Sequence, residues 1–403
     1  MLYAYLFLDD FVLLYPVYTL LFSDSGLSVW QISSLFVIWS VSSMALEVPS
    51  GAWADATSRR TLLVIGPLLT AAAFALWVGA PNYWVFALGF LLWGLKAALA
   101  SGALEALVYE ELQHIGASQR YSTLMGRGHA VGVLAAMCSG AVAAPVLAEG
   151  GFHAVGAVSV AVCVLASLAA MFFPENRIQA SHEHDQGWTR TVAAGLTETR
   201  RSRPVRAAVV LVAVVASVWG ALDEYTPLLV ESTGVPDTDV ALLMVVVWAG
   251  AAAGGLLAGR AARLSTRTLA ALICCGAALL GAGALAGHPS GVVGVAAAFG
   301  IFQLATIVAD TRLQDSITGP ARATVTSLAG MATDVATLVV YGSYAVLADF
   351  GGHGGAFAIL ALPYLAISLW LLTARHLTSS FVEVEDSSVA TTHEEDHDAP
   401  GSV

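Results

Sequence analysis

Three charged residues lie inside long apolar stretches, where they could bind and release a proton. Asp9 and Asp10 lie near the middle of the apolar stretch 2–22. Lys96, the only lysine, lies near the middle of the stretch 83–106. A charge at the centre of a bilayer costs about 2.5–3.5 kcal/mol on insertion scales, so such residues are candidates for function. We expect Lys96 to pair with Asp9 or Asp10, and a proton on that carboxylate would break the pair.

These charged residues have two alternative interpretations. Lys96 could bind the carboxylate of an anionic substrate, or the pair could be a structural salt bridge. Adjacent residues of a helix point about 100° apart, so only one of the two aspartates is expected to face a central cavity. The other would face the stretch 121–147, which carries Arg127 and His129.

A second acidic pair, Asp223 and Glu224, repeats the pattern around Asp9 in a later apolar stretch. It lies a few residues from the outer end of that stretch. We therefore expect it in an outer cavity, either touching substrate or on a solvated rim. Trp93 and Trp219 lie deep enough in their stretches to contact an apolar substrate, and packing in the core is the alternative.

About twelve apolar stretches of membrane-spanning length position these residues. A helix crosses a bilayer in about 20 residues. With 57% hydrophobic residues, 11% charged residues and a mean hydropathy of +0.75, the chain has too few polar residues for an ordinary soluble surface. The sequence therefore predicts an all-α membrane protein with twelve transmembrane helices. The predicted spans are 2–22, 29–50, 61–79, 83–106, 121–147, 153–173, 207–229, 239–259, 267–286, 291–313, 322–347 and 355–376.

The basic residues indicate which side of the membrane each connection occupies. Apart from Lys96 and Arg127, every Lys and Arg falls in or beside every second gap between the predicted spans. Connections rich in Lys and Arg stay in the cytoplasm. We therefore expect a multi-pass protein of the inner (plasma) membrane with both termini in the cytoplasm. The basic gaps hold Arg59 and Arg60, Arg120, the arginines from 177 to 206, those from 260 to 267, Arg312 and Arg322, and Arg375.

A long polar stretch divides the predicted spans into two sets of six. We expect an N-terminal six-helix bundle over 1–173, a cytoplasmic linker over 174–206 and a C-terminal six-helix bundle over 207–377. The acidic segment 378–403 has too few apolar residues to fold and is expected to be a disordered cytoplasmic tail. The halves look like repeats, because the second span of each ends in small residues and is followed by arginines.

A polar cluster ends the second predicted span. Glu47, Gly51 and Asp55 are spaced by four, so they share one face of a helix. Gly51 allows another helix to approach, and Asp55 can accept hydrogen bonds from the N-terminus of a neighbouring helix. Arg59 and Arg60 follow and can reach nearby carboxylates. We expect these residues to form a latch on the cytoplasmic side.

Other acidic residues could belong to the same latch. Glu110 and Glu111, beyond the fourth span, are candidate partners of the basic pair. Glu105 and Asp310 lie near the cytoplasmic ends of their spans, so we expect a gate or latch role rather than contact with substrate.

The segment from Glu47 to Arg60 resembles the signature that follows the second span in the major facilitator superfamily, Gly-x-x-x-Asp followed by a basic pair. The resemblance covers about residues 1–377. It implies two six-helix bundles, a binding site between them at mid-membrane, and alternating access by rocking. It also implies that Asp55 engages the N-terminus of the eleventh helix and stabilises the outward-facing state.

The sequence departs from the family pattern in three places. Thr57 or Ser58 replaces the glycine expected before the basic pair. Gly259 stands where the repeated motif would have an aspartate, so the second latch should be weaker. The glycines around Pro145 in the fifth span do not have the spacing of the family's antiporters, so this motif does not identify an antiporter.

These observations favour a proton-coupled secondary transporter that exports small organic molecules, either apolar or cationic. The alternative is proton-coupled uptake of a small anionic metabolite bound at Lys96. A membrane sensor or scaffold is a third reading, but the soluble parts are too small to hold an output domain. The expected partners are a small-molecule substrate, protons and the lipid bilayer, and the expected state is a monomer.

We expect neither an enzyme nor a cofactor or metal site. A nucleophile and a base do not share a helix face in the predicted spans. The histidines at 182, 184, 393 and 397 lie in polar segments that do not predict a metal site. The four cysteines lie in apolar spans, and we expect them to be packing residues. Nucleic-acid binding has no support, because basic residues form no patch beyond the connections.

Overall fold

A computed structural model describes residues 1–100, 102–175, 202–261, 264–317 and 322–373, without the side chains of 47–56 and 323. Within these residues the chain is helical and contains no strand. Most of the predicted linker and the whole predicted tail lie outside the described residues. The helices are α1 (Leu2–Asp10), α2 (Tyr18–Asp24), α3 (Val29–Ala56), α4 (Arg59–Gly79), α5 (Tyr83–Ala100), α6 (Ala103–His114), a short 3-10 turn (Ser118–Arg120), α7 (Tyr121–Ala170), α9 (Arg203–Glu231), α10 (Asp237–Ala261), α11 (Thr266–Leu285), α12 (Gly291–Ser316), α13 (Arg322–Leu360) and α14 (Leu362–Thr373).

Nine helices in the described part of the chain are long and apolar enough to cross a membrane. Two of them exceed a single crossing. The 50 residues of α7 would extend about 75 Å, against a hydrocarbon core of about 30 Å. Both α7 and α13 break at a glycine with positive φ, Gly151 (φ 60°) and Gly352 (φ 65°). These glycines fall between predicted spans, where connections were expected, and the count of twelve spans stays a prediction.

The first predicted span is not a continuous helix, so the prediction of one helix over 2–22 was wrong. The helix α1 ends at Asp10, and α2 begins only at Tyr18. Pro16 explains the break, because proline has no N–H and disfavours helical backbone before it. The freed N–H of Leu14 donates to the hydroxyl of Ser159 in α7 at 3.0 Å, as a broken membrane helix requires.

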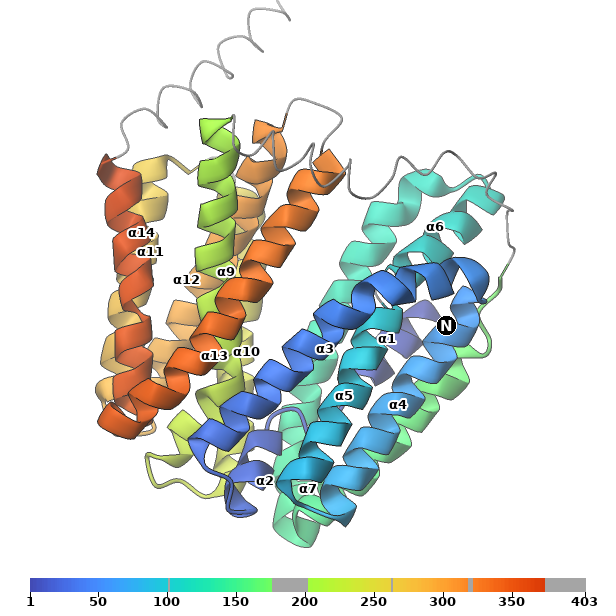
Figure 1. The fold of residues 1–403 in the computed structure, drawn as a ribbon, viewed down its shortest axis with the longest axis horizontal. Helices are drawn as coiled ribbons and strands as arrows, with labels where there is room; N and C mark the ends of the chain where they lie inside the picture. Colours follow the sequence, from blue (N-terminus) through green and yellow to red (C-terminus); the bar gives the residue numbers. More distant parts are fainter. Residues whose placement is uncertain (101, 176–201, 262–263, 318–321, 374–403) are drawn as a thin grey trace, which may run out of the picture.

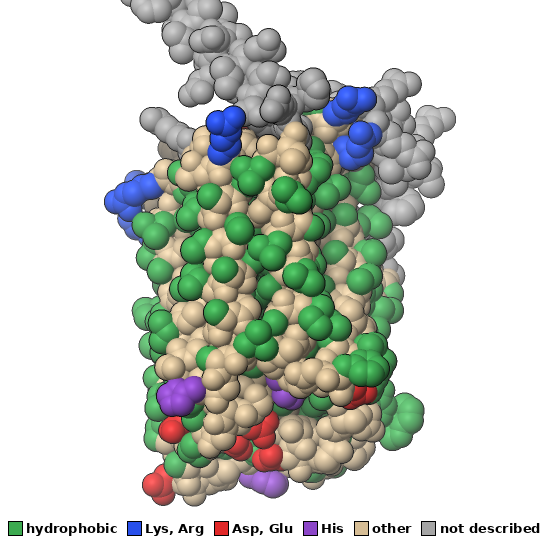
Figure 2. All heavy atoms as spheres, turned by 90° about the vertical axis from the view of Figure 1, so that its left-hand side faces the viewer, with side chains coloured by type: hydrophobic (Ala, Val, Ile, Leu, Met, Phe, Trp, Pro, Cys, Tyr) green, Lys and Arg blue, Asp and Glu red, His purple; other side chains and the backbone are tan. Residues whose placement is uncertain are grey.

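The helices form two groups (Figure 1). Helices α1 to α7 lie on the right of the view and α9 to α14 on the left. Across the groups α10 packs on α7, α13 on α3 and α2 on α9. In the side view of Figure 2, Lys and Arg side chains gather at one end of the molecule and Asp, Glu and His at the other. We name the first end, where α4, α7 and α13 begin and α10 ends, the arginine end.

Glycines allow α10 and α12 to touch backbone to backbone. A Cβ at Gly254 would lie 1.9 Å from the carbonyl oxygen of Gly300, and one at Gly250 would lie 2.2 Å from that of Ala296. Real Cβ atoms cannot come so near, so both positions require glycine. The Gly-x-x-x-Gly spacing of Gly250 and Gly254 is typical of helices that pack closely in membranes. This contact fixes α10 against α12 where both helices line the cavity described below.

Candidate functional site

The last turn of α1 and the last turns of α5 bring Asp9 and Lys96 together. The Nζ of Lys96 lies 2.9 Å from Oδ2 of Asp9, and the two side chains are only 14% and 22% exposed. Gly66 of α4 leaves room for the lysine, because a Cβ there would lie 3.3 Å from Cγ of Lys96. The predicted contact is therefore present in the N-terminal group. Its part in proton coupling stays a prediction.

Asp10 faces α7, the side predicted for one of the two aspartates. A Cβ at Gly132 would lie 2.3 Å from Oδ2 of Asp10, so glycine leaves the space that this carboxylate occupies. The predicted partner Arg127 is exposed on α7. No ion pair joins it to Asp10 among the residues with described side chains.

Trp93 lies in an aromatic stack next to the ion pair. Its ring stacks on Tyr15 at a centroid distance of 5.5 Å and on Trp39 at 5.2 Å. The hydroxyl of Tyr15 lies 3.5 Å from the backbone oxygen of Asp9. Trp93 is therefore part of the packing that surrounds Asp9, and it does not belong to the lining of the large cavity.

A cavity of about 580 Å³ lies between the two groups of helices. This volume suits a small organic ligand. Asp223 is the only carboxylate, and Lys and Arg are absent, among the described residues that line it. The lining consists of Gly126, His129, Ala130, Val133, Leu134, Ala136 and Met137 of α7, Trp219 and Asp223 of α9, Trp248, Ala251, Ala252, Gly255 and Leu256 of α10, and Gln303 and Ile307 of α12.

Two tryptophans line the cavity together with Asp223. The indole nitrogen of Trp248 lies 3.3 Å and 3.4 Å from the two carboxylate oxygens of Asp223 and donates to them. The indole nitrogen of Trp219 donates to the hydroxyl of Thr306 at 3.3 Å. Sequence reasoning missed Trp248 and Gln303, because an indole and an amide in an apolar span carry no charge that marks them. The cavity therefore holds one carboxylate bonded to an indole, with a second indole in the same lining.

The turn of α9 that carries Trp219 is held by Tyr364 of α14. The buried hydroxyl of Tyr364 accepts from the Trp219 N–H at 2.9 Å and donates to the Val215 carbonyl at 3.1 Å. These two backbone groups are one helical turn apart, so the hydroxyl bridges a rung of the helix. Two turns later Pro227 lacks the N–H that would bond the Asp223 carbonyl. Asp223 therefore lies on a stretch of α9 with a modified hydrogen-bond ladder.

Glu224 takes part in the junction between the two groups. The Tyr18 hydroxyl of α2 donates to Oε2 of Glu224. Nearby, the hydroxyls of Ser33 and Tyr225 lie 2.7 Å apart. Glu224 is partly buried and has Tyr18 as its partner, and its place at an outer cavity stays a prediction. These bonds join α2 and α3 to α9.

A third bond extends the junction to the end of the molecule away from the arginines. There the indole N–H of Trp30, in the first turn of α3, donates to Asp349 of α13 at 2.6 Å. Figure 1 shows α2 and the start of α3 beside the lower part of the other group. The two groups are thus joined at this end, while the cavity lies toward the arginine end.

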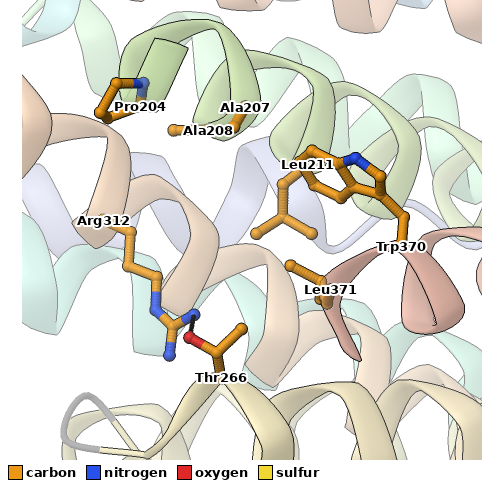
Figure 3. A pocket seen from close by; sticks show the side chains of 8 residues that line it. All are labelled: Pro204, Ala207, Ala208, Leu211, Thr266, Arg312, Trp370 and Leu371. Carbon is orange, nitrogen blue, oxygen red and sulfur yellow. Dashed lines mark hydrogen bonds between the residues drawn. The ribbon is translucent and has the colours of Figure 1, made fainter. Parts of the chain in front are cut away.

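A second, much smaller cavity lies at the arginine end of the C-terminal group (Figure 3). Arg312 of α12 points toward the start of α11, where it donates to the hydroxyl of Thr266 at 3.4 Å, and it also donates to the carbonyl of Leu264, just before that helix, at 2.7 Å. Pro204 and Trp370 lie on the other side of the cavity. Its volume of about 20 Å³ holds about one water molecule, so it does not admit an organic substrate.

Comparison with known proteins identifies the family. The family model of the Major Facilitator Superfamily matches residues 1–309. The chain belongs to this superfamily. Its members are transporters, and the fold is one that works by alternating access between the two sides of a membrane. No curated protein matches the sequence.

Solved structures of other superfamily transporters have the same fold. A mutant of the nucleoside transporter NupG aligns with a TM-score of 0.76 at 13% identity, over 92% of this chain and 98% of that one. A bacterial homologue of the human lysosomal transporter Spinster, inward-facing and unoccupied, gives 0.66 at 14% identity over 94% of both chains. A D-xylose-proton symporter gives 0.67 at 14% identity, over 92% and 95%. At such identities the likeness concerns the fold alone.

The superfamily motif at the arginine end is only partly described. Arg59 forms an ion pair with Glu110 of α6, one of the partners that the sequence suggested. The Arg59 N–H also donates to Glu175 at 2.7 Å, which places a carboxylate at the N-terminus of α4. Arg60 reaches the Phe173 carbonyl at 3.4 Å. All these contacts lie within the N-terminal group of this transporter.

The contacts of the described residues do not bring the other predicted latch residues together. The side chains of Glu47, Gly51 and Asp55 lie outside the described part of the structure. Glu105 of α6 and Asp310 of α12 are exposed. Their predicted roles as latch or gate residues stay predictions.

Proposed function

We propose that this transporter exports small organic molecules, apolar or cationic, in exchange for protons. The observation that carries the proposal is the cavity of about 580 Å³, with mostly apolar walls and Asp223 as the only carboxylate among its described lining residues. A lone carboxylate in an apolar cavity favours a positively charged ligand. The rings of Trp219 and Trp248 can add cation–π attraction.

The ion pair of α1 and α5 is the proposed coupling element. A proton on Asp9 would remove one charge of the pair with Lys96 and so change the relative stability of two conformations. Asp10 lies next in the chain and faces α7, which also lines the cavity. A conformational change that follows protonation of Asp9 or Asp10 could therefore be transmitted to the cavity through α7.

The proposed orientation follows from the basic residues. Placing the arginine end in the cytoplasm satisfies the positive-inside rule, in an inner membrane and with both termini in the cytoplasm. The cavity then lies on the cytoplasmic side and the junction at Tyr18 and Glu224 on the outer side, which corresponds to an inward-facing carrier. We propose that residues 1–173 and 207–377 are the two bundles that rock, in a monomer.

The alternative, uptake of a small anion bound at Lys96, has weaker support. The Nζ of Lys96 is already bonded to Asp9, and Lys96 does not line the cavity. An anion would have to displace Asp9 before it could bind. Uptake that survives Lys96→Ala unchanged would remove this alternative.

Proton movement driven by substrate tests the proposal. Purified protein in proteoliposomes should release or take up protons when a cationic drug is added, and Asp9→Asn combined with Asp10→Asn should abolish this signal. Asp24→Asn, an exposed carboxylate at the end of α2, is the matched control and should leave the signal intact. Drug-driven proton flux that is unchanged in the double variant would refute the coupling role of this pair.

A further inference from the structure

The helices α7 and α10 touch closely on the side of the cavity away from the arginines. A Cβ at Gly140 of α7 would lie 2.7 Å from Cγ2 of Val245 and 3.2 Å from the Ala241 carbonyl oxygen. This glycine therefore lets the two helices meet almost backbone to backbone. Substrate cannot pass between α7 and α10 at this level.

Toward the arginine end, both helices line the cavity instead. Residues of α7 from Gly126 to Met137 and residues of α10 from Trp248 to Leu256 line the cavity. The two helices run in opposite directions, so these segments both begin next to the Gly140 contact and lead away from it toward the arginines. We call the space between these two lining segments the slit, and it forms one flank of the cavity.

The edges of the slit are apolar. Leu134 of α7 is 55% exposed and Leu256 of α10 is 79% exposed, although both helices belong to the candidate membrane spans. Large apolar side chains exposed at this depth are compatible with lipid tails and costly in contact with water. Deeper inside, Asp223 carries the only negative charge among the described lining residues.

We propose that the slit between α7 and α10 is a lateral entrance through which a lipophilic organic cation passes from the inner leaflet of the membrane to Asp223. The inference rests on the proposed function and adds the route and the chemical class of substrate. Such a cation partitions into the bilayer with its apolar groups among the lipid tails. Apolar slit edges let it enter without rehydration, and the carboxylate inside complements its charge.

Narrowing the slit tests the route separately from the binding site. Leu134→Trp and Leu256→Trp add bulk to its two edges. Val142→Trp on α7 and Leu242→Trp on α10 are matched controls, because these side chains are 39% and 47% exposed and lie outside the cavity lining. The probe is tetraphenylphosphonium, measured as initial transport rate in proteoliposomes and as equilibrium binding to the detergent-solubilised protein.

The Leu134→Trp/Leu256→Trp variant should transport the probe about tenfold more slowly, which corresponds to about 1.4 kcal/mol of added barrier. Its binding in detergent should stay close to that of the wild type, since detergent does not confine the probe to a leaflet. The controls should keep the wild-type rate. A double variant that binds and transports at wild-type rates would overturn the entrance and leave the proposed function standing. Wild-type protein that neither binds nor transports the probe would overturn both.

A spectroscopic measurement keeps the inference testable if the tryptophan variants misfold. After replacement of the native cysteines, a spin label at position 256 in a bilayer should be more accessible to molecular oxygen than to a water-soluble nickel chelate. A label at position 242 provides the lipid-facing reference. The opposite preference at position 256 would show that the slit opens to water, and would overturn the lateral entrance.

Discussion

Replacing Lys96 with Met should strongly destabilise the fold, because it leaves Asp9 charged and without its partner. The two charges lie 2.9 Å apart with side chains 14% and 22% exposed. At an effective dielectric constant of about 20 their attraction is about 6 kcal/mol, and the loss of hydration offsets part of it. Removing one member of such a pair costs about 3–5 kcal/mol. We therefore expect the free energy of unfolding of Lys96→Met to fall by about 3 kcal/mol.

The assay is a double-mutant cycle on unfolding in mixed micelles titrated with SDS. Asp9→Asn should also destabilise, whereas Asp9→Asn with Lys96→Met should recover most of the loss, because two neutral side chains then share the site. Arg127→Met, an exposed position on α7, is the control and should change stability by less than about 0.5 kcal/mol. Effects of the two single variants that simply add would refute the reasoning.

Three further changes test the packing. Gly254→Ala should cost about 1–3 kcal/mol of stability, because its Cβ would lie 1.9 Å from a carbonyl oxygen of α12; Gly259→Ala, with nothing within 4 Å, is the control in the same thermal-shift assay. Tyr364→Phe removes the hydroxyl that bridges a rung of α9 and should cost about 1 kcal/mol; hydrogen exchange along α9 equal to that of the wild type would contradict the bridge. Arg59→Gln and Glu110→Gln should each cost at most about 1 kcal/mol, since the pair lies at the end of the molecule with side chains 25% and 27% exposed. Losses well above this would contradict a partly solvated pair.

The helices and the ion pair could be predicted from the sequence, because an unpaired backbone group or an unpaired charge costs much free energy inside a bilayer. Apolar runs must be helical in a bilayer, since every backbone group needs an internal partner. The only lysine, placed in an apolar run, needed an acidic partner, and Asp9 supplies it. Arg59 pairs with Glu110, one of its predicted partners, because the segments after the second and the fourth predicted spans meet at the arginine end.

The remaining parts depend on contacts between segments far apart in the chain. Pro16 marks the break of the first span in the sequence, but the hydroxyl of Ser159 that makes the break tolerable lies 145 positions from Leu14. Likewise, the indole of Trp248 bonds Asp223 only because α9 and α10 pack together. The position of Glu224 in its apolar stretch predicts a place near the outer end. Only the packing of α2 against α9 shows that Glu224 joins the two groups of helices.

Equilibrium binding of tetraphenylphosphonium to the purified protein tests most directly whether Asp223 makes the cavity a site for organic cations. The wild type should bind the probe, and Asp223→Asn should weaken binding at least about tenfold, or about 1.4 kcal/mol. Asp239→Asn, an exposed carboxylate in the first turn of α10, should bind as the wild type does. Equal affinity of the wild type and Asp223→Asn would contradict the account.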